Sequence, residues 1–281
     1  MPCVIEAVAA SGVQTLYHYD GFNEKFLKDL LTNRRIHLSN PVEFNDPWDC
    51  HMRFDTRSAV DPIYRGCIAD ILWKQRDLSI PAREAERIDR GLRENEAFFI
   101  EMIQKRLARL VRHSVICRWR LYCLTPAPDN SLMWSHYSDR HKGICLEFDA
   151  RRMESMRVRA VSYDDSPPAL DVLALVRGEV TPEDVSRVFL TKSRDWEKEC
   201  EYRLIARAGE ADAVSQASIP TTIGEYLTLG PNVLTSVIAG CRTSDEDLVR
   251  IKEMVQEHAP GLSVKRAVQA VDRYSLSILP A

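Results

Sequence analysis

The sequence predicts a protein of the α+β class, with a mainly antiparallel or split sheet, flanking helices and a helical insertion. Short stretches that alternate apolar and polar residues recur along the chain, as strands with one buried face do. From about 62 to 113 they give way to a charged segment whose apolar residues have helical spacing. At about 150 residues per domain, a chain of 281 residues could hold two modules or one larger domain. We expect a single domain, 1–281, that carries the insertion.

The composition argues against several classes of protein. Lys and Arg number 38 against 41 Asp and Glu, so a net charge of -3 offers no positive field for a general nucleic-acid coat. The mean hydropathy is -0.27. No apolar run reaches the roughly 18 residues of a membrane helix, so we expect no membrane partner. Residues 1–12 lack the basic leader of a signal sequence, which predicts a cytoplasmic protein.

The first elements follow from local signals. Residues 14–19 alternate as a strand, and Asn23 is a typical cap for the helix after it. That helix is expected to present Phe26, Leu27, Leu30 and Leu31 on one face. A second strand at 36–39 leads into a loop at 40–48, where two prolines interrupt regular pairing.

The rest of the chain returns to strands with helices between them. Strands are predicted by apolar alternation, and helices by caps and acidic first turns. The expected strands are 115–124, 143–148, 158–163, 200–206, 226–229, 237–239, 263–267 and 274–278. The expected helices are 170–177, 182–190 and 244–257.

The first candidate for chemistry is His18, in Leu16-Tyr17-His18-Tyr19. Alternation in a strand sends Leu16 and His18 to one side and the two tyrosines to the other. A histidine beside a core leucine is either a core residue with a hydrogen-bonded ring or a site residue. Both interpretations stay open.

The second candidate is the segment 129–143, which reads as a capped short helix followed by a strand. Trp134 and Tyr137 share a helix face at a spacing of three, as core packing or a ligand platform would. His136 and His141 are five apart, off the spacing that joins two zinc ligands, and we predict no metal. Lys142 before a glycine suggests an anion-binding turn.

The third candidate is the charged segment 192–203. In a strand, Glu199, Glu201 and Arg203 would project from the same side. Two carboxylates raise each other's pKa, and a nearby arginine lowers both, so the two could differ in basicity. The alternative is a solvated charged face.

Together these segments resemble a widespread bacterial family known as domain of unknown function 2971. The departures are Thr125, where a serine after an aromatic residue is more usual, and Asp20, which replaces a small hydroxyl residue. The matching segments are Leu16-Tyr17-His18-Tyr19, Leu38-Ser39, Phe44-Asn45-Asp46-Pro47, Cys123-Leu124-Thr125, 132–137, 142–148, Lys192, 196–203 and 237–240.

A remoter resemblance is to ADP-ribosyltransferases, whose split sheet carries a histidine or arginine early, a tyrosine or serine midway and a glutamate late. Here that order is His18, then Ser39 or Tyr137, then Glu201 within Glu199-x-Glu201. The resemblance implies NAD as the substrate, with Glu201 stabilising an oxocarbenium-like ribose and Glu199 orienting or deprotonating the acceptor. It also implies that His18 holds a ribose hydroxyl and that Tyr137 stacks on nicotinamide.

The remaining contacts to NAD and to the acceptor follow from the same resemblance. No G-x-G-x-x-G loop is present to hold a pyrophosphate, so Arg203, Lys192 or Lys142 would have to do so. Trp134 and Ser39 complete the expected cofactor contacts. Asn45 and Asp46 are the expected substrate contacts.

Two other functions stay open. The same surface could recognise a nucleotide or a protein without catalysis, with the helical insertion as a second contact face. Glu199, Glu201 and Asp46 could instead hold a divalent ion in a hydrolase. For the enzyme we expect His18, Trp134 or Tyr137, and Glu201 to converge with part of the loop 44–47.

Overall fold

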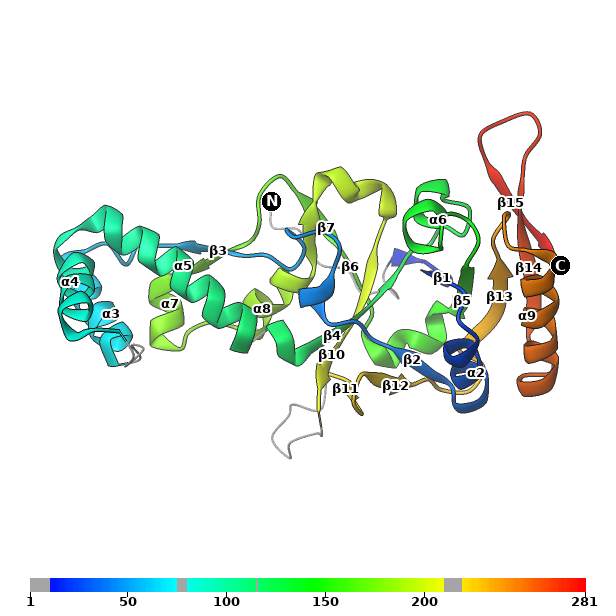
Figure 1. Cartoon of the computed structure of the whole chain (residues 1–281), viewed down its shortest axis with the longest axis horizontal. Helices are drawn as coiled ribbons and strands as arrows, with labels where there is room; N and C mark the ends of the chain where they lie inside the picture. The colour runs from blue at the N-terminus through cyan, green and yellow to red at the C-terminus, as the bar shows by residue number, and fades with distance from the viewer. Residues whose placement is uncertain (1–10, 75–79, 115, 210–218) are drawn as a thin grey trace. The chain divides into compact units, whose positions relative to one another are not determined.

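The computed structural model describes residues 11–74, 80–114, 116–209 and 219–281 (Figure 1). Helices and mostly antiparallel strands occur together, which confirms the predicted α+β class. The chain forms two compact units. The first comprises Met1–Phe44, Arg118–Tyr163 and Arg194–Ala281, and the second comprises Asn45–Cys117 and Asp164–Ser193. The single domain 1–281 therefore stays a prediction.

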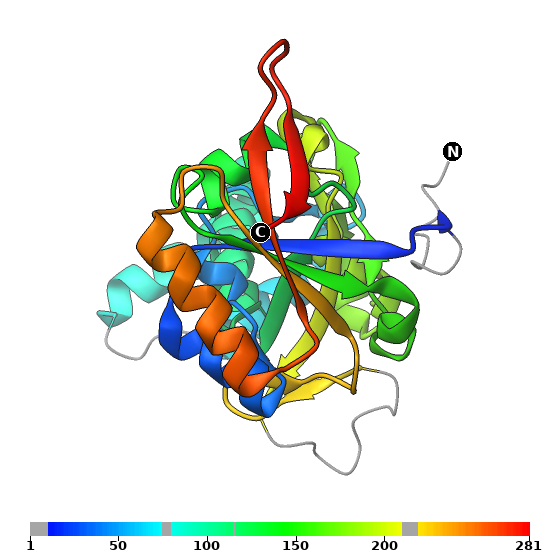
Figure 2. The same ribbon diagram turned by 90° about the vertical axis from the view of Figure 1, so that its right-hand side faces the viewer.

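The larger sheet of the first unit has five strands in the order β1-β5-β13-β14-β15. Neighbours are antiparallel except β13 and β14, which are parallel because helix α9 (Asp245–His258) connects them. Figure 2 shows α9 beside α2 (Glu24–Asn33). The strands are β1 (Thr15–Asp20), β5 (Ile144–Asp149), β13 (Leu234–Ala239), β14 (Ser263–Gln269) and β15 (Leu276–Pro280).

A second sheet of the first unit is built around β10 (Tyr202–Ala208). It pairs antiparallel with β4 (Trp119–Leu124) and β6 (Arg159–Ala160), and parallel with β11 (Thr221–Thr222). The backbones of Tyr17 and Thr125 exchange hydrogen bonds of 2.7 and 2.8 Å, so β1 of the first sheet adjoins the end of β4. The strands of the two larger sheets thus meet through the backbones of Tyr17 and Thr125.

Apolar side chains from both sheets, α2 and α9 form one core. Asn23 caps α2 as predicted, and Leu27, Leu30 and Leu31 are buried. Phe26 departs from the prediction because it is 50% exposed, with its ring over that of His37. The spacing of apolar residues predicted the helix correctly but counted Phe26 among its buried residues.

The second unit contains the predicted helical segment, which forms α3 (Pro62–Lys74), α4 (Ala82–Glu94) and α5 (Glu96–Ser114). The predicted helix at 170–177 begins instead as a strand, β8 (Ala169–Asp171), which pairs parallel with β3 (Arg53–Asp55). It becomes helix α7 (Val172–Arg177) only after Asp171 caps it. The helix α8 (Pro182–Phe189) follows, with a capping box at Thr181.

Several short elements complete the description. The predicted strand 158–163 is divided into β6 and β7. No helix in the described ranges is long and apolar enough to cross a membrane. The short elements are β2 (Arg35–His37), β7 (Ser162–Asp164), β9 (Thr191–Ser193), β12 (Tyr226–Thr228), α6 (Ser131–Tyr137) and the 3-10 helices at Pro41–Glu43, Ile116–Arg118, Ala150–Met156 and Arg194–Glu199.

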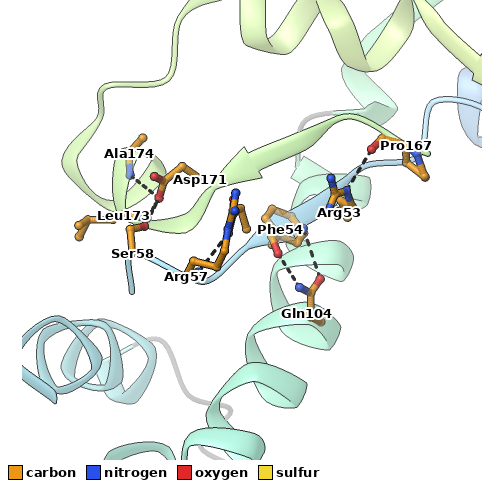
Figure 3. A network of polar contacts seen from close by, with 10 residues as sticks. Arg53, Phe54, Arg57, Ser58, Gln104, Pro167, Asp171, Leu173 and Ala174 are labelled. Atoms are coloured by element: carbon orange, nitrogen blue, oxygen red, sulfur yellow. Dashed lines mark hydrogen bonds and ion pairs between the residues drawn. The ribbon is translucent and has the colours of Figure 1, made fainter. Parts of the chain in front are cut away.

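Polar contacts hold the interior of the second unit together (Figure 3). Gln104 of α5 accepts a hydrogen bond from the Phe54 backbone N–H at 3.3 Å and donates one to the Phe54 carbonyl at 2.6 Å. Ser58 donates to Asp171 at 2.6 Å, and the same carboxylate caps α7. Gln104 thereby ties the long helix α5 to strand β3.

Replacing Gln104 tests this tie. Gln104→Ala removes two hydrogen bonds to one strand residue, so we expect a loss of about 1–3 kcal/mol of unfolding free energy. Urea denaturation measures it. Lys105→Ala, at a side chain 70% exposed on the same helix, is the control. A loss in Gln104→Ala no greater than in this control would show that the contact does not stabilise the unit.

Candidate functional site

Strand β4 holds two predicted site segments that are far apart in the sequence. The ring Nδ1 of His18 lies 2.7 Å from the carbonyl oxygen of Cys123. Cys123 pairs in register with Arg203 on β10. Just beyond β4, the Thr125 hydroxyl donates to the carbonyl oxygen of Glu199 at 2.8 Å. One stretch of backbone therefore fixes both His18 and the Glu199-x-Glu201 segment.

His18 lies on the side of β1 that alternation predicts. Leu16 is in the main core, and the His18 ring stacks on Tyr122 of that core, with centroids 4.0 Å apart and planes 22° apart. A carbonyl oxygen can only accept, so Nδ1 carries the hydrogen in the contact with Cys123. Burial lowers the pKa of His18, outweighing the opposing effects of Asp20 and the hydrogen bond.

These two properties fix the state of the ring. At neutral pH the imidazole is uncharged, and Nε2 carries a lone pair. Among the described residues, no hydrogen bond reaches this nitrogen. His18 is half-buried. The histidine is therefore a core residue with a hydrogen-bonded ring, and its role as a site residue stays a prediction.

The tautomer and the pKa can be measured directly. In a two-dimensional ¹H–¹⁵N spectrum of the ring nitrogens, we expect His18 as the Nδ1–H tautomer with a pKa below 6.5. Because this pKa is lower than that of the unfolded chain, His18 favours folding fully above about 6.5 and loses that effect as the pH falls to the folded pKa. A pKa at or above 6.5 would contradict the burial of the ring.

Glu201 and Arg203 form a buried ion pair. Arg203 Nε lies 2.6 Å from one carboxylate oxygen of Glu201 and Nη2 lies 2.9 Å from the other. The two side chains are 3% and 0% exposed. The Arg203 guanidinium carbon lies 5.7 Å from the centre of the Phe44 ring. The side chains share one side as predicted, but they point at each other in the protein interior rather than forming a solvated face.

Glu199 is not part of the strand, contrary to the expectation that it projects from one strand face with Glu201 and Arg203. It ends the 3-10 helix Arg194–Glu199. Cys200 then takes a left-handed conformation, with φ 48°, before β10 begins. The Glu199 carboxylate accepts a hydrogen bond from the Tyr137 hydroxyl at 2.8 Å. The backbone turn thus sends the two carboxylates to different partners.

Helix α6 and the 3-10 helix are joined at two further points. Asn130 caps α6 with its oxygen and donates its amide hydrogen to the Lys198 carbonyl at 2.8 Å. The ring centroids of His136 and Trp196 are 6.1 Å apart. Together with the Tyr137 to Glu199 bond, these contacts hold α6 alongside the carboxylate segment.

Trp134 is in the core instead of on a ligand surface. It is 0% exposed, its indole N–H donates to the Pro128 carbonyl at 2.8 Å, and its ring meets Tyr19 edge-on. Tyr137, three residues later, carries the polar contact of this helix. Of the two aromatic residues predicted to contact NAD, only Tyr137 is bonded to a site carboxylate.

The other predicted residues are distributed over both units. In the first unit, Ser39 makes a backbone bridge to Leu121 of β4. In the second unit, Lys192 is buried with its Nζ 3.7 Å from Asp49. Asn45 is exposed, and Asp46 is buried with one oxygen accepting the Trp48 N–H at 2.9 Å. Within the first unit Tyr137 contacts Glu199 and His18 contacts Cys123 of β4, and the convergence of His18 with Tyr137 and the two glutamates stays a prediction.

Sequence reasoning missed two aromatic contributors, Tyr122 and Tyr163, whereas Phe44 belongs to the loop 44–47 that it included. Tyr122 stacks on His18, Phe44 lies by Arg203, and the Tyr163 hydroxyl accepts the Glu201 N–H at 2.7 Å. Strand alternation marks Tyr122 as a possible partner only once the pairing of β4 is known. Within the described ranges, no three His, Cys, Asp or Glu side chains are grouped so that they could hold a metal ion.

Comparison with known proteins yields one match. Residues 133–204 match the model of a family described as protein of unknown function (DUF2971). This segment covers less than half of the chain. It contains Tyr137, Glu199, Glu201 and Arg203 but not His18. Neither the curated proteins nor the solved structures contain a match. The resemblance to ADP-ribosyltransferases has no support from these comparisons.

Proposed function

We propose that the first unit binds NAD and cleaves its bond between nicotinamide and ribose, as an ADP-ribosyltransferase-like enzyme with an unidentified acceptor. The observation that carries the proposal is the shared attachment to β4 and the residue after it: the His18 ring donates to the Cys123 carbonyl, and the Thr125 hydroxyl donates to the main-chain carbonyl of Glu199. A histidine acceptor and a carboxylate held on one rigid backbone are what a ribosyl cation needs. A cytoplasmic location is part of this proposal.

In this proposal His18 orients the ribose. Its Nε2 lone pair accepts a hydrogen bond from a ribose hydroxyl, while the bond from Nδ1 to Cys123 and the stack on Tyr122 keep the ring in place. A neutral ring suits this role because it adds no positive charge beside a developing cation.

Between the two carboxylates, the geometry favours Glu199 over Glu201 for the catalytic charge. Both oxygens of Glu201 are bound by the Arg203 guanidinium, which compensates its charge. The carboxylate of Glu199, which is 6% exposed, accepts a hydrogen bond from the Tyr137 hydroxyl. We assign Glu199 to the ribosyl cation, Tyr137 to the positioning of Glu199, and the pair of Glu201 and Arg203 to holding the start of β10.

The proposed reaction exchanges nicotinamide for an acceptor at the anomeric carbon of the ribose. The bond between the ribose anomeric carbon and the nicotinamide nitrogen breaks, its electron pair stays on nitrogen, and neutral nicotinamide leaves. The ribose becomes an oxocarbenium ion, which the Glu199 carboxylate stabilises electrostatically. An acceptor hydroxyl, amine or water forms the new bond to the anomeric carbon and loses a proton to solvent or to the carboxylate.

The assay is the release of nicotinamide from NAD by the full chain, followed by chromatography with and without added acceptor proteins. Release that depends on the protein is the expected result. Binding of NAD by calorimetry without release would favour a non-catalytic nucleotide-binding module, which the near burial of both carboxylates also fits. Neither binding nor release would remove NAD from the proposal altogether.

A further inference from the structure

Two turns of the first unit are joined at one end of the larger sheet. The first, residues 138–143, connects α6 to β5, and the second, residues 240–243, follows β13. The Arg242 N–H donates to the His141 carbonyl at 3.0 Å, and the Thr243 hydroxyl donates to the Lys142 carbonyl at 2.8 Å. We call this pair of segments the double turn.

The double turn is rigid and strained. A Cβ at Gly240 would overlap the carbonyl oxygen of His141, so only glycine allows this approach. Three consecutive residues with side chains, Asp139, Arg140 and His141, have φ of 41°, 55° and 70°. Such left-handed conformations cost about 1–2 kcal/mol per residue. The close approach at Gly240 and these conformations therefore fix the course of the main chain in the double turn.

The double turn concentrates cations without carboxylate partners. Arg140, Lys142 and Arg242 are exposed, and none of them forms an ion pair or a side-chain hydrogen bond with any residue in the described ranges. Nearby cations of the same sheet are paired: Lys265 with Glu147 at 2.6 Å and Arg266 with Asp245 at 3.3 Å. The double turn thus carries three positive side chains that form no ion pair in the described ranges, and its one carboxylate is the exposed Asp139.

A buried histidine nitrogen points to the same place. His141 Nδ1 is buried and has no hydrogen-bond partner among the described residues. Leaving such a group unsatisfied costs about 1–3 kcal/mol. Burial, and after it the positive charge of Arg242, lowers the pKa of His141, so the guanidinium acts directly on the ring. The unsatisfied nitrogen of His141 therefore lies in the turn that carries Arg140 and Lys142, with Arg242 close enough to act on the ring.

We propose that the double turn binds the diphosphate group of the dinucleotide. This inference rests on the proposed function and supplies what the sequence lacks, a place for the phosphates. Of the cations considered for that task, Arg203 is bound to Glu201, and Lys192 lies in the second unit. Lys142 remains, and the structure adds Arg140 and Arg242 to it.

The double turn lies next to the proposed NAD site. Ser138 directly follows Tyr137, and its hydroxyl donates to the Asp20 carbonyl at 3.1 Å. Asp20 ends β1 two residues beyond His18. At about 3.3 Å per strand residue, the backbones of His18 and Asp20 are about 7 Å apart. One molecule can reach His18 with its ribose and the double turn with its phosphates.

The test is calorimetry of inorganic pyrophosphate and of ADP binding to the full chain. The site variant is Arg140→Gln, Lys142→Gln and Arg242→Gln together. The control is Lys25→Gln, Lys28→Gln and Lys252→Gln, which removes the same charge from exposed positions of the first unit. We expect the site variant to bind pyrophosphate about a thousandfold more weakly, since each of the three charged contacts contributes about tenfold. The control should bind like the wild type.

Each outcome decides between the two proposals. Absence of pyrophosphate binding to the wild type, or an equal loss in both triple variants, overturns the double-turn site. Nicotinamide release with an unchanged KM in the site variant overturns it too, while the proposed function stands. Pyrophosphate binding that the site variant loses, in a protein that never releases nicotinamide, supports the site and refutes NAD cleavage. The three single variants give the answer if the triple variant fails to fold.

Discussion

Glu199→Gln is expected to slow nicotinamide release from NAD by about a hundredfold or more, with little change in KM. The amide keeps the shape of the side chain and can still accept the Tyr137 hydrogen bond, but it removes the charge that stabilises the ribosyl cation. The rate at saturating NAD, measured by chromatography of nicotinamide, gives the effect. Because KM stays nearly constant, the loss is in the chemical step.

The control for this variant is Glu197→Gln, an exposed carboxylate in the same 3-10 helix. It makes the same change of charge away from the Tyr137 hydroxyl. We expect its rate to stay within about twofold of the wild type, as for a surface substitution away from the site. If the two variants lose activity equally, the assignment of Glu199 is wrong.

Arg203→Met is expected to reduce the unfolding free energy by about 3–5 kcal/mol, because it leaves the Glu201 carboxylate buried without its partner. Urea denaturation followed by circular dichroism measures the loss. Arg207→Met, four residues along the same strand β10 and only half-buried, is the matched control. We expect a loss there of about 1 kcal/mol or less.

A second substitution identifies the cause of this loss. Glu201→Gln added to Arg203→Met removes the buried charge, so the double variant should regain part of the stability. A double variant as unstable as Arg203→Met alone would show that the arginine acts through its packing near Phe44 and not through its charge.

Local signals account for most of the secondary structure that the sequence predicts. Asn23, Asn130 and Ser244 each cap a helix with a side-chain oxygen, which their sequence positions predict. Alternation along β1 likewise places Leu16 and His18 on one side of the strand. Such features depend on neighbours within one turn or one strand, so a single sequence contains them.

The candidate site was predictable only in part, because its geometry depends on distant pairing. The left-handed backbone of Cys200 separates Glu199 from β10, and cysteine is not a residue that signals this conformation. Cys123 of β4 pairs in register with Arg203 of β10, and the carbonyl oxygen of Cys123 accepts a hydrogen bond from the His18 ring of β1. No local pattern encodes that register. The sequence therefore supplied candidate residues without their partners.

The most direct test of the central claim, that His18 and Glu199 act on one ribose, is a crystal structure of the full chain with a non-cleavable NAD analogue. We expect a ribose hydroxyl at about 2.7–3.2 Å from His18 Nε2, with the Glu199 carboxylate beside the anomeric carbon. An analogue bound at saturating concentration away from both side chains would contradict the claim.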